Sequence, residues 1–150
     1  MRHIWVGLAL AAVALAADGR VDVYSAKDLA ARGRKLEQKR APFASEDLAR
    51  YGNHYTMLAE RDGTGSAEVH EHEADVFVIE HGAATLVTGG RLVNGRTQKA
   101  GEIRGSSIEG GERHSVATGD IIHIPAGVPH QLLVEKGQPF TYFVIKVTGQ

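Results

Sequence analysis

Three histidines and one aspartate have residue types and spacing that could bind a metal. In EVHEHEAD, residues 68–75, His70 and His72 are one residue apart and Asp75 follows closely. His130 ends the segment HIPAGVPH further along the chain. Imidazole nitrogens and carboxylate oxygens are common ligands of divalent transition metals. The four side chains are either two parts of one metal site or polar groups on a histidine-rich sheet.

Strand geometry favours the first interpretation. Residues i and i+2 of a strand point to the same face, so His70 and His72 are expected to project together. Asp75 begins the next predicted strand and can supply an oxygen ligand. His130 follows PAGVP, where two prolines restrict φ and Gly127 tolerates a positive φ. Such a turn can hold a fourth ligand rigidly.

Length and composition indicate one domain. The chain has 150 residues and a formal net charge of -1, which gives no electrostatic reason to expect a nucleic-acid partner. It has no cysteine, so disulfides, thiolate zinc sites and thiol nucleophiles are excluded. Any metal must be bound by His, Asp, Glu or water.

Residues 1–17 are predicted to be a secretory signal peptide. A weakly basic start precedes an apolar run, and small residues follow at positions 14 and 16. A membrane anchor is the alternative, but the run is shorter than the roughly 20 residues that a spanning helix needs. We therefore expect the mature protein to be periplasmic or secreted and not to span a membrane.

The rest of the chain is predicted to be a helical arm followed by strands. Residues 18–49 form the arm, whose helix starts at the capping-box-like pair Ser25 and Asp28 and ends before Pro42. From residue 50 to 150, short β-branched segments separated by Gly, Asn, Asp or Pro favour an all-β sandwich or barrel. These segments are 54–60, 67–72, 75–82, 83–90, 91–95, 119–125, 131–137 and 141–149.

Residues 99–115 are the least regular part of this region and are predicted to be a long loop. Glu102, Arg104 and Glu112 lie within it. Loops at the mouth of a barrel often carry substrate contacts, although we assign no catalytic role to these three charges.

The strand region resembles the cupin superfamily. GSAEVHEHEADVFVIEHG is similar to the first cupin motif, with H-x-H, an acid, and a glycine after six further residues at Gly82. GDIIHIPAGVPH is similar to the second motif, with Gly119, Pro125, Gly127 and His130 at its spacing. The resemblance covers roughly residues 50–148. It implies an all-β double-stranded β-helix, the small single-domain cupin barrel, with a divalent metal near its mouth.

The resemblance also implies which residues bind the metal, and this sequence departs from the family pattern at one of them. In cupins the two histidines and the acid of the first motif bind the metal with the histidine of the second. Carried over, these are His70, His72, Asp75 and His130. The usual acid is Glu, three or four residues beyond the second histidine, whereas Asp75 follows after two. Three imidazoles with at most one carboxylate accept manganese, iron, nickel, copper or zinc without strong discrimination.

Three functions are open at this point, because the fold does not select a reaction. The first is an exported metal-dependent cupin that acts on a small oxygenated molecule such as a sugar, organic acid or phenolic. Isomerase, lyase and dioxygenase chemistry all fit such a site. The second is a non-catalytic cupin that binds or senses a small ligand. The third is a structural barrel whose main task is oligomerisation. A homodimer is the assembly that the resemblance suggests.

Overall fold

Two antiparallel sheets face each other, and a helix covers the outside of one of them. The computed structural model describes residues 19, 21–39 and 41–150. Its elements, in chain order, are α1 Ala26–Glu37, β1 Phe43–Arg50, β2 His54–Arg61, β3 Ala67–His70, β4 Glu73–His81, β5 Ala83–Thr88, β6 Arg91–Val93, β7 Arg96–Lys99, β8 Glu102–Gly105, β9 Ser107–Glu109, β10 Glu112–Ala117, β11 Ile121–Ile124, β12 His130–Leu133 and β13 Phe140–Thr148.

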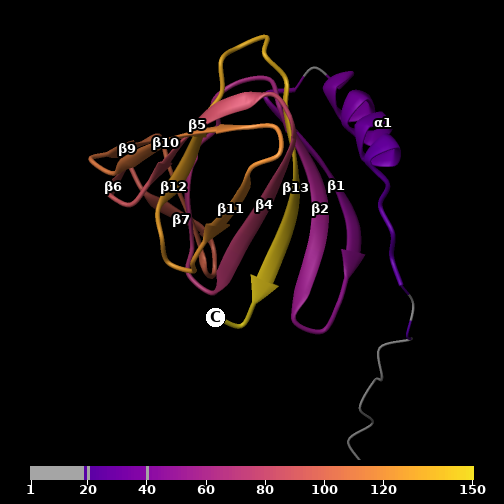
Figure 1. Cartoon of the computed structure of the whole chain (residues 1–150). Coiled ribbons are helices and arrows are strands. Elements are labelled where there is room, and N and C mark those ends of the chain that lie inside the picture. Colours follow the sequence, from indigo (N-terminus) through magenta and orange to yellow (C-terminus); the bar gives the residue numbers. More distant parts are fainter. Residues whose placement is uncertain (1–18, 20, 40) are drawn as a thin grey trace, which may run out of the picture.

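The strands are not paired in chain order. The five-stranded sheet has the order β1-β2-β13-β4-β11, and the six-stranded sheet has the order β10-β5-β12-β3-β8-β7. β6 and β9 form a separate two-stranded ribbon that projects from the body of the barrel (Figure 1). This arrangement brings β3 and β4 together with β12 and β13, which lie about fifty residues further along the chain, around one interior. The prediction of an all-β architecture is confirmed.

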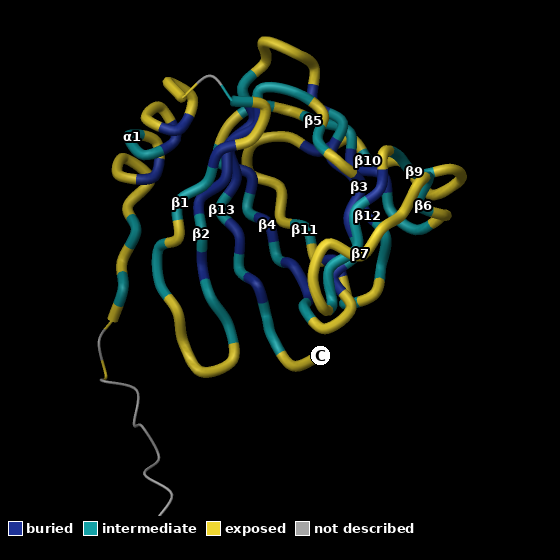
Figure 2. The backbone as a smooth tube through the Cα atoms, turned by 180° about the vertical axis from the view of Figure 1, so that it is seen from behind, coloured by how far each residue is buried: buried dark blue, intermediate teal, exposed yellow. Residues whose placement is uncertain are grey.

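Alternation along the strands separates two apolar clusters. On β2, Ala59 faces the space between the sheets, whereas Leu58 faces α1. The larger cluster between the sheets includes Phe77, Ile79, Phe140 and other buried side chains of both sheets. Figure 2 shows the buried stretches along β2, β13 and β4, with exposed loops around them.

The predicted helix is present and packs on the outer face of the five-stranded sheet. Ser25 is its N-cap and accepts a hydrogen bond from the backbone N–H of Asp28, as the capping-box pattern indicates. The helix ends at Glu37, before Pro42. Leu29 and Leu36 are buried against the sheet. None of the helical structure in the described residues has the length and apolar character needed to cross a membrane.

The structure corrects the sequence interpretation in two places. Residues 99–115 are not a long loop, because they contain β8, β9 and most of β10. The many glycines and charged residues of this segment obscure the strand pattern in the sequence. The strands pair at or near the edge of the six-stranded sheet and in the β6–β9 ribbon. β1 was not predicted either, because FASEDLAR has one fully buried residue, Ala44, and no clear apolar alternation. Residues 1–17 lie outside the described residues.

Candidate metal centre

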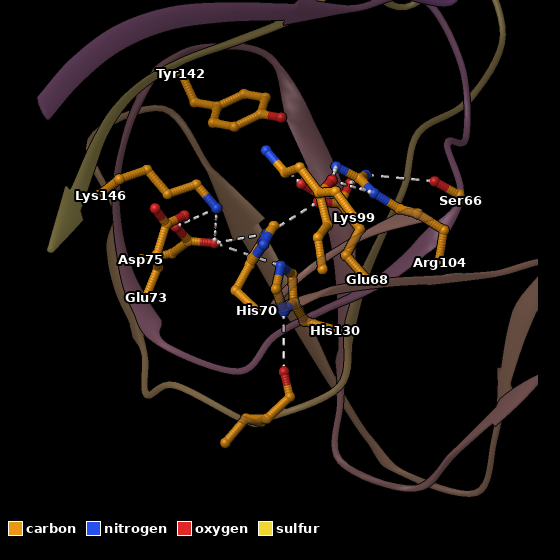
Figure 3. Close-up of polar contacts among 12 residues, drawn as sticks. Ser66, Glu68, His70, Glu73, Asp75, Lys99, Arg104, His130, Tyr142 and Lys146 are labelled. Atoms are coloured by element: carbon orange, nitrogen blue, oxygen red, sulfur yellow. Dashed lines mark hydrogen bonds and ion pairs between the residues drawn. The ribbon is translucent and has the colours of Figure 1, made fainter. Parts of the chain in front are cut away.

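Four side chains of types that can bind a metal converge between the two sheets (Figure 3). Glu68 and His70 come from β3, Asp75 from β4 and His130 from the first position of β12. All four residues are buried. Glu68 and His70 share a face because they are two residues apart on one strand. The backbone of β12 pairs with that of β3 at His130 and Glu68, which places the third element beside them.

The ligand atoms of these residues are close to one another. His70 Nε2 lies 3.2 Å from Glu68 Oε2 and 3.6 Å from Asp75 Oδ2. His130 Nε2 lies 3.5 Å from the same Asp75 oxygen. One atom each from Glu68, His70 and His130 lies within 4.8 Å of the other two. Glu68, His70 and His130 therefore form one cluster, and Asp75 lies against its two imidazoles.

His130 presents a lone pair to this cluster. Its Nδ1 atom is 3.0 Å from the carbonyl oxygen of Val128, and a carbonyl only accepts, so Nδ1 must carry the proton. Burial lowers the pKa of His130, against the opposing effect of the Glu68 charge. The ring is therefore neutral near pH 7, and its Nε2 atom is unprotonated. A histidine oriented by a backbone carbonyl is typical of metal ligands.

A lysine holds the second carboxylate. Lys146 Nζ lies 2.6 Å and 2.9 Å from the two oxygens of Asp75. Asp75 is 1% exposed, so this is a buried ion pair. Lys146 comes from the end of β13 that pairs with the start of β4, which fixes the orientation of the Asp75 carboxylate toward the two imidazoles.

Two arginines hold Glu68. Arg61 Nη2 lies 3.1 Å and Arg104 Nη1 lies 2.5 Å from Oε1 of Glu68. Arg61 also donates to the Tyr142 hydroxyl at 2.9 Å. Burial acts to raise the pKa of Glu68, but the hydrogen bond from His70 and the charges of Arg104 and Arg61 outweigh it. The pKa of Glu68 is therefore well below its usual range, and the group is a carboxylate near pH 7.

The structure brings His70, Asp75 and His130 together but places His72 elsewhere. β3 ends at His70, and the next backbone N–H, that of Glu71, donates to the carbonyl of Gly101 at 2.8 Å. His72 therefore lies in the bend before β4 and is exposed. The i, i+2 argument fails because the strand stops too early. The same rule, applied toward the N-terminus, would have found Glu68.

Glu68 also explains why Asp75 is closer to H-x-H than the acid of the cupin motif. If Glu68 and His70 take the two histidine positions of the first motif, four residues separate His70 from Asp75. That distance agrees with the cupin pattern, and the six residues between Asp75 and Gly82 are unchanged. The sequence analysis missed Glu68 because H-x-H was the more conspicuous pattern.

The four residues fit a divalent metal. Ligand atoms at about 2.0–2.2 Å from one ion lie roughly 2.8–3.6 Å from their neighbours in octahedral or tetrahedral geometry. Three pairs here have such separations: His70–Glu68 at 3.2 Å, His70–Asp75 at 3.6 Å and His130–Asp75 at 3.5 Å. His130 Nε2 and Asp75 Oδ2 both offer lone pairs across a shared space. A cation between them satisfies both atoms. The set consists of two imidazoles and two carboxylates.

This cluster lines a cavity of about 390 Å³. The other lining residues include Phe77, Leu132, Tyr142 and Val144 from the core, and Ser66, Lys99, Glu102 and Arg104 at the side of β8. The volume is in the range of small-molecule sites. The cavity is therefore large enough for a small molecule beside the cluster.

Comparison with known proteins agrees with this architecture. Residues 104–150 match the model of the AraC-like ligand binding domain. No curated protein matches the sequence significantly.

Solved structures cover more of the chain. A Bacillus halodurans protein, BH2720, is 19% identical over 89% of this chain and 85% of its own, with a TM-score of 0.59. An uncharacterized conserved protein with a double-stranded β-helix domain from Klebsiella pneumoniae is 13% identical over 87% of this chain and 93% of its own, with a TM-score of 0.57. The cupin domain of Cnp3 from Schizosaccharomyces pombe is 8% identical over 71% of this chain and 61% of its own, with a TM-score of 0.53. The chain therefore has the cupin fold, the double-stranded β-helix that its two motifs predicted.

Proposed function

We propose that this protein is a metal-dependent cupin that acts on a small oxygenated molecule, such as a sugar, an organic acid or a phenolic. One divalent transition metal ion would be held by Glu68, His70, Asp75 and His130. The observation that carries the proposal is the convergence of lone pairs. Neutral His130 and the Asp75 carboxylate face each other at 3.5 Å, with His70 Nε2 within 3.6 Å of the same carboxylate oxygen.

The chain's own residues prepare this site for chemistry. The ion itself would supply Lewis-acid polarisation of a bound oxygen function. Lys146 fixes Asp75, and the Val128 carbonyl fixes the ring of His130. Burial raises the pKa of Tyr142, so this phenol keeps its proton. Its hydroxyl lines the cavity and accepts from Arg61, which leaves the O–H free to donate to an oxygen of the substrate.

Elemental analysis tests the metal. The protein is purified without a histidine tag, and its metal content is measured for wild type, His70→Ala, His130→Ala and His72→Ala. We expect a stoichiometric transition metal in wild type and its loss in the first two variants. His72→Ala is the matched control and should keep its metal, because His72 is exposed outside the cluster. Wild-type protein that holds no metal and gains no thermal stability from Mn²⁺, Fe²⁺ or Zn²⁺ would contradict the proposal.

A non-catalytic ligand-binding cupin is the second candidate function. The match of residues 104–150 to an AraC-like ligand binding domain favours it, since that description names binding and no reaction. Both candidates use the same cavity. Turnover of any member of a panel of sugars, organic acids and phenolics by the metal-loaded protein selects the enzyme. Saturable binding without turnover selects the binding module.

Export and assembly are further proposals. We infer that residues 1–17 direct the protein to the periplasm or the outside of the cell, on the basis of their sequence pattern. N-terminal sequencing of protein recovered from the periplasm or medium tests this, with Ala17 or Asp18 expected as the first residue. The homodimer and the structural-barrel alternative stay predictions, which light scattering in solution addresses.

A further inference from the structure

We propose that the cavity takes a carboxylate-bearing ligand and that Arg104 binds its carboxylate. This inference rests on the proposed metal and narrows the class of ligand from oxygenated molecules to organic acids. Three observations support it: the charge balance of the cavity, the different exposure of its cations, and the contacts of Glu68.

The charged side chains that line the cavity balance before a metal is added. The five cations are Arg50, Arg61, Lys99, Arg104 and Lys146, and the five anions are Asp47, Glu68, Glu73, Asp75 and Glu102. A divalent ion adds two positive charges to a space that is partly closed to water. Uncompensated charge in such a space is costly. An anionic ligand supplies the missing negative charge, whereas a neutral one does not.

Glu68 and Asp75, the two carboxylates that would bind the metal, are also the ion-pair partners of three of these cations. Lys146 is paired with Asp75, and Arg61 and Arg104 are both paired with Glu68. When Glu68 and Asp75 give lone pairs to a metal, their attraction for these side chains weakens. A new anion is then most favourable beside whichever cation can turn toward the cavity.

Of these three cations, Arg104 has the most exposed side chain, 27% against 10% for Arg61 and 10% for Lys146. Arg61 is held by Tyr142 and lies over the ring of Phe43 at 4.7 Å. Lys146 bridges both oxygens of Asp75. The Arg104 side chain is paired with Glu102, and Figure 3 shows it beside Glu68 and Ser66. It therefore has access to the cavity and is close to the metal position.

Glu68 indicates the size of the group that fits. Its single carboxylate spans from His70, 3.2 Å from Oε2, to Arg104, 2.5 Å from Oε1. A ligand carboxylate beside it can likewise reach the metal with one oxygen and Arg104 with the other. The planar guanidinium matches a carboxylate through two parallel hydrogen bonds. A hydroxyl or carbonyl next to that carboxylate would add a second oxygen for the metal.

Binding of malate tests the inference. Malamide is the neutral molecule of the same shape, and inorganic phosphate is a second anion. The full chain is loaded with Mn²⁺ and its metal content is measured. Calorimetry then gives the affinity for each molecule. We expect malate to bind at least tenfold more tightly than malamide and phosphate. Arg104→Gln should lower malate affinity at least tenfold at unchanged metal content, and Arg104→Lys should give an intermediate affinity. Arg91→Gln, which changes an exposed arginine of the β6–β9 ribbon, is the matched control and should bind like wild type.

The outcomes separate this inference from the proposed function. Protein that takes up no Mn²⁺ contradicts the proposed function itself. Protein that holds Mn²⁺ but binds malate and malamide equally contradicts the inference alone, as does equal binding by Arg104→Gln. Loss of metal from both Arg104 variants would make Arg104 a residue that positions the metal site and would also overturn the inference. Tighter binding of phosphate than of malate would contradict the inference that the cavity prefers a carboxylate-bearing ligand.

Discussion

The Nε2 atom of His130 lies 3.5 Å from Oδ2 of Asp75, and both atoms present lone pairs to the space between them. On its other side, the same carboxylate is 2.6 Å and 2.9 Å from Lys146. Asp75 is therefore shared between a fixed cation and the proposed metal position. A salt bridge alone explains Lys146 but not the approach of His130.

Lys146→Met tests this sharing. Removal of one partner of a buried ion pair costs about 3–5 kcal/mol, because the remaining charge is left uncompensated. We expect a loss of about 3 kcal/mol in the free energy of unfolding when a chelator is present, and a smaller loss with saturating Mn²⁺, which would neutralise Asp75. Urea denaturation under both conditions measures the difference. The double variant Asp75→Asn, Lys146→Met should recover part of the stability in chelator, whereas equal losses with and without Mn²⁺ would speak against a metal beside Asp75.

Glu68→Gln tests the proposed ligand that the sequence analysis missed. An amide oxygen is a weaker ligand than a carboxylate, and the change also removes the charge partner of Arg61 and Arg104. We expect metal affinity to fall by at least about tenfold, the lower limit seen even for partners outside the ligand set. Metal competition with a chromophoric chelator gives the affinity.

Glu71→Gln is the matched control for that experiment. Glu71 is the neighbour of His70 on the exposed side of the chain, so its removal should leave metal affinity unchanged. Equal affinities for Glu68→Gln and wild type would remove Glu68 from the site.

Glu60 makes stability depend on pH. It lies on β2, is fully buried, and neither carboxylate oxygen has a hydrogen-bond partner among the described residues. Burial, with smaller contributions from the charges of Asp62 and Glu37, raises the pKa of Glu60 to about 7. A raised folded-state pKa means that the folded protein binds the proton more tightly than the unfolded chain does. Stability is therefore highest below about pH 4.5 for this group and decreases as pH rises to about 7.

The expected size of this effect is at most about 3 kcal/mol, from 1.36 kcal/mol per pKa unit. Urea unfolding of wild type and Glu60→Gln between pH 5 and 8 isolates it, because the other groups contribute equally to both proteins. As pH rises, the free energy of unfolding of Glu60→Gln should increase relative to that of wild type, and this difference should level off above pH 7. Parallel curves would show that Glu60 is ionised in the folded protein throughout.

The contact between α1 and the five-stranded sheet requires a glycine at position 33. A Cβ atom at Gly33 would lie 3.1 Å from Cγ2 of Thr141. Gly33→Val adds three carbons at this point, and overpacking of this kind costs about 1–3 kcal/mol. Thermal or urea denaturation measures the loss. Lys35→Val, an exposed change on the same helix, controls for helix propensity and should cost less than Gly33→Val. Equal costs would mean that the helix does not pack closely at Gly33.

The fold could largely be predicted from the sequence. Segments such as 54–60 and 141–149 became strands because their apolar residues alternate where one face is buried in the core. β1 and the strands of 99–115 could not be predicted this way, since polar strands at an edge or in a ribbon are defined by backbone pairing and not by an apolar face. Pairing partners are a property of the whole sheet.

The same distinction applies to the candidate site. Sequence alone selected His70, Asp75 and His130 as candidates, because motif spacing ties them to fixed places on β3, on β4 and at the start of β12. Tertiary structure decided that Glu68 and not His72 joins them, since the backbone of Glu71 turns away to pair with Gly101 and ends β3 at His70. It also decided which charges surround the cluster. Arg61, Arg104 and Lys146 belong to three different strands and meet these carboxylates only after the two sheets have packed face to face.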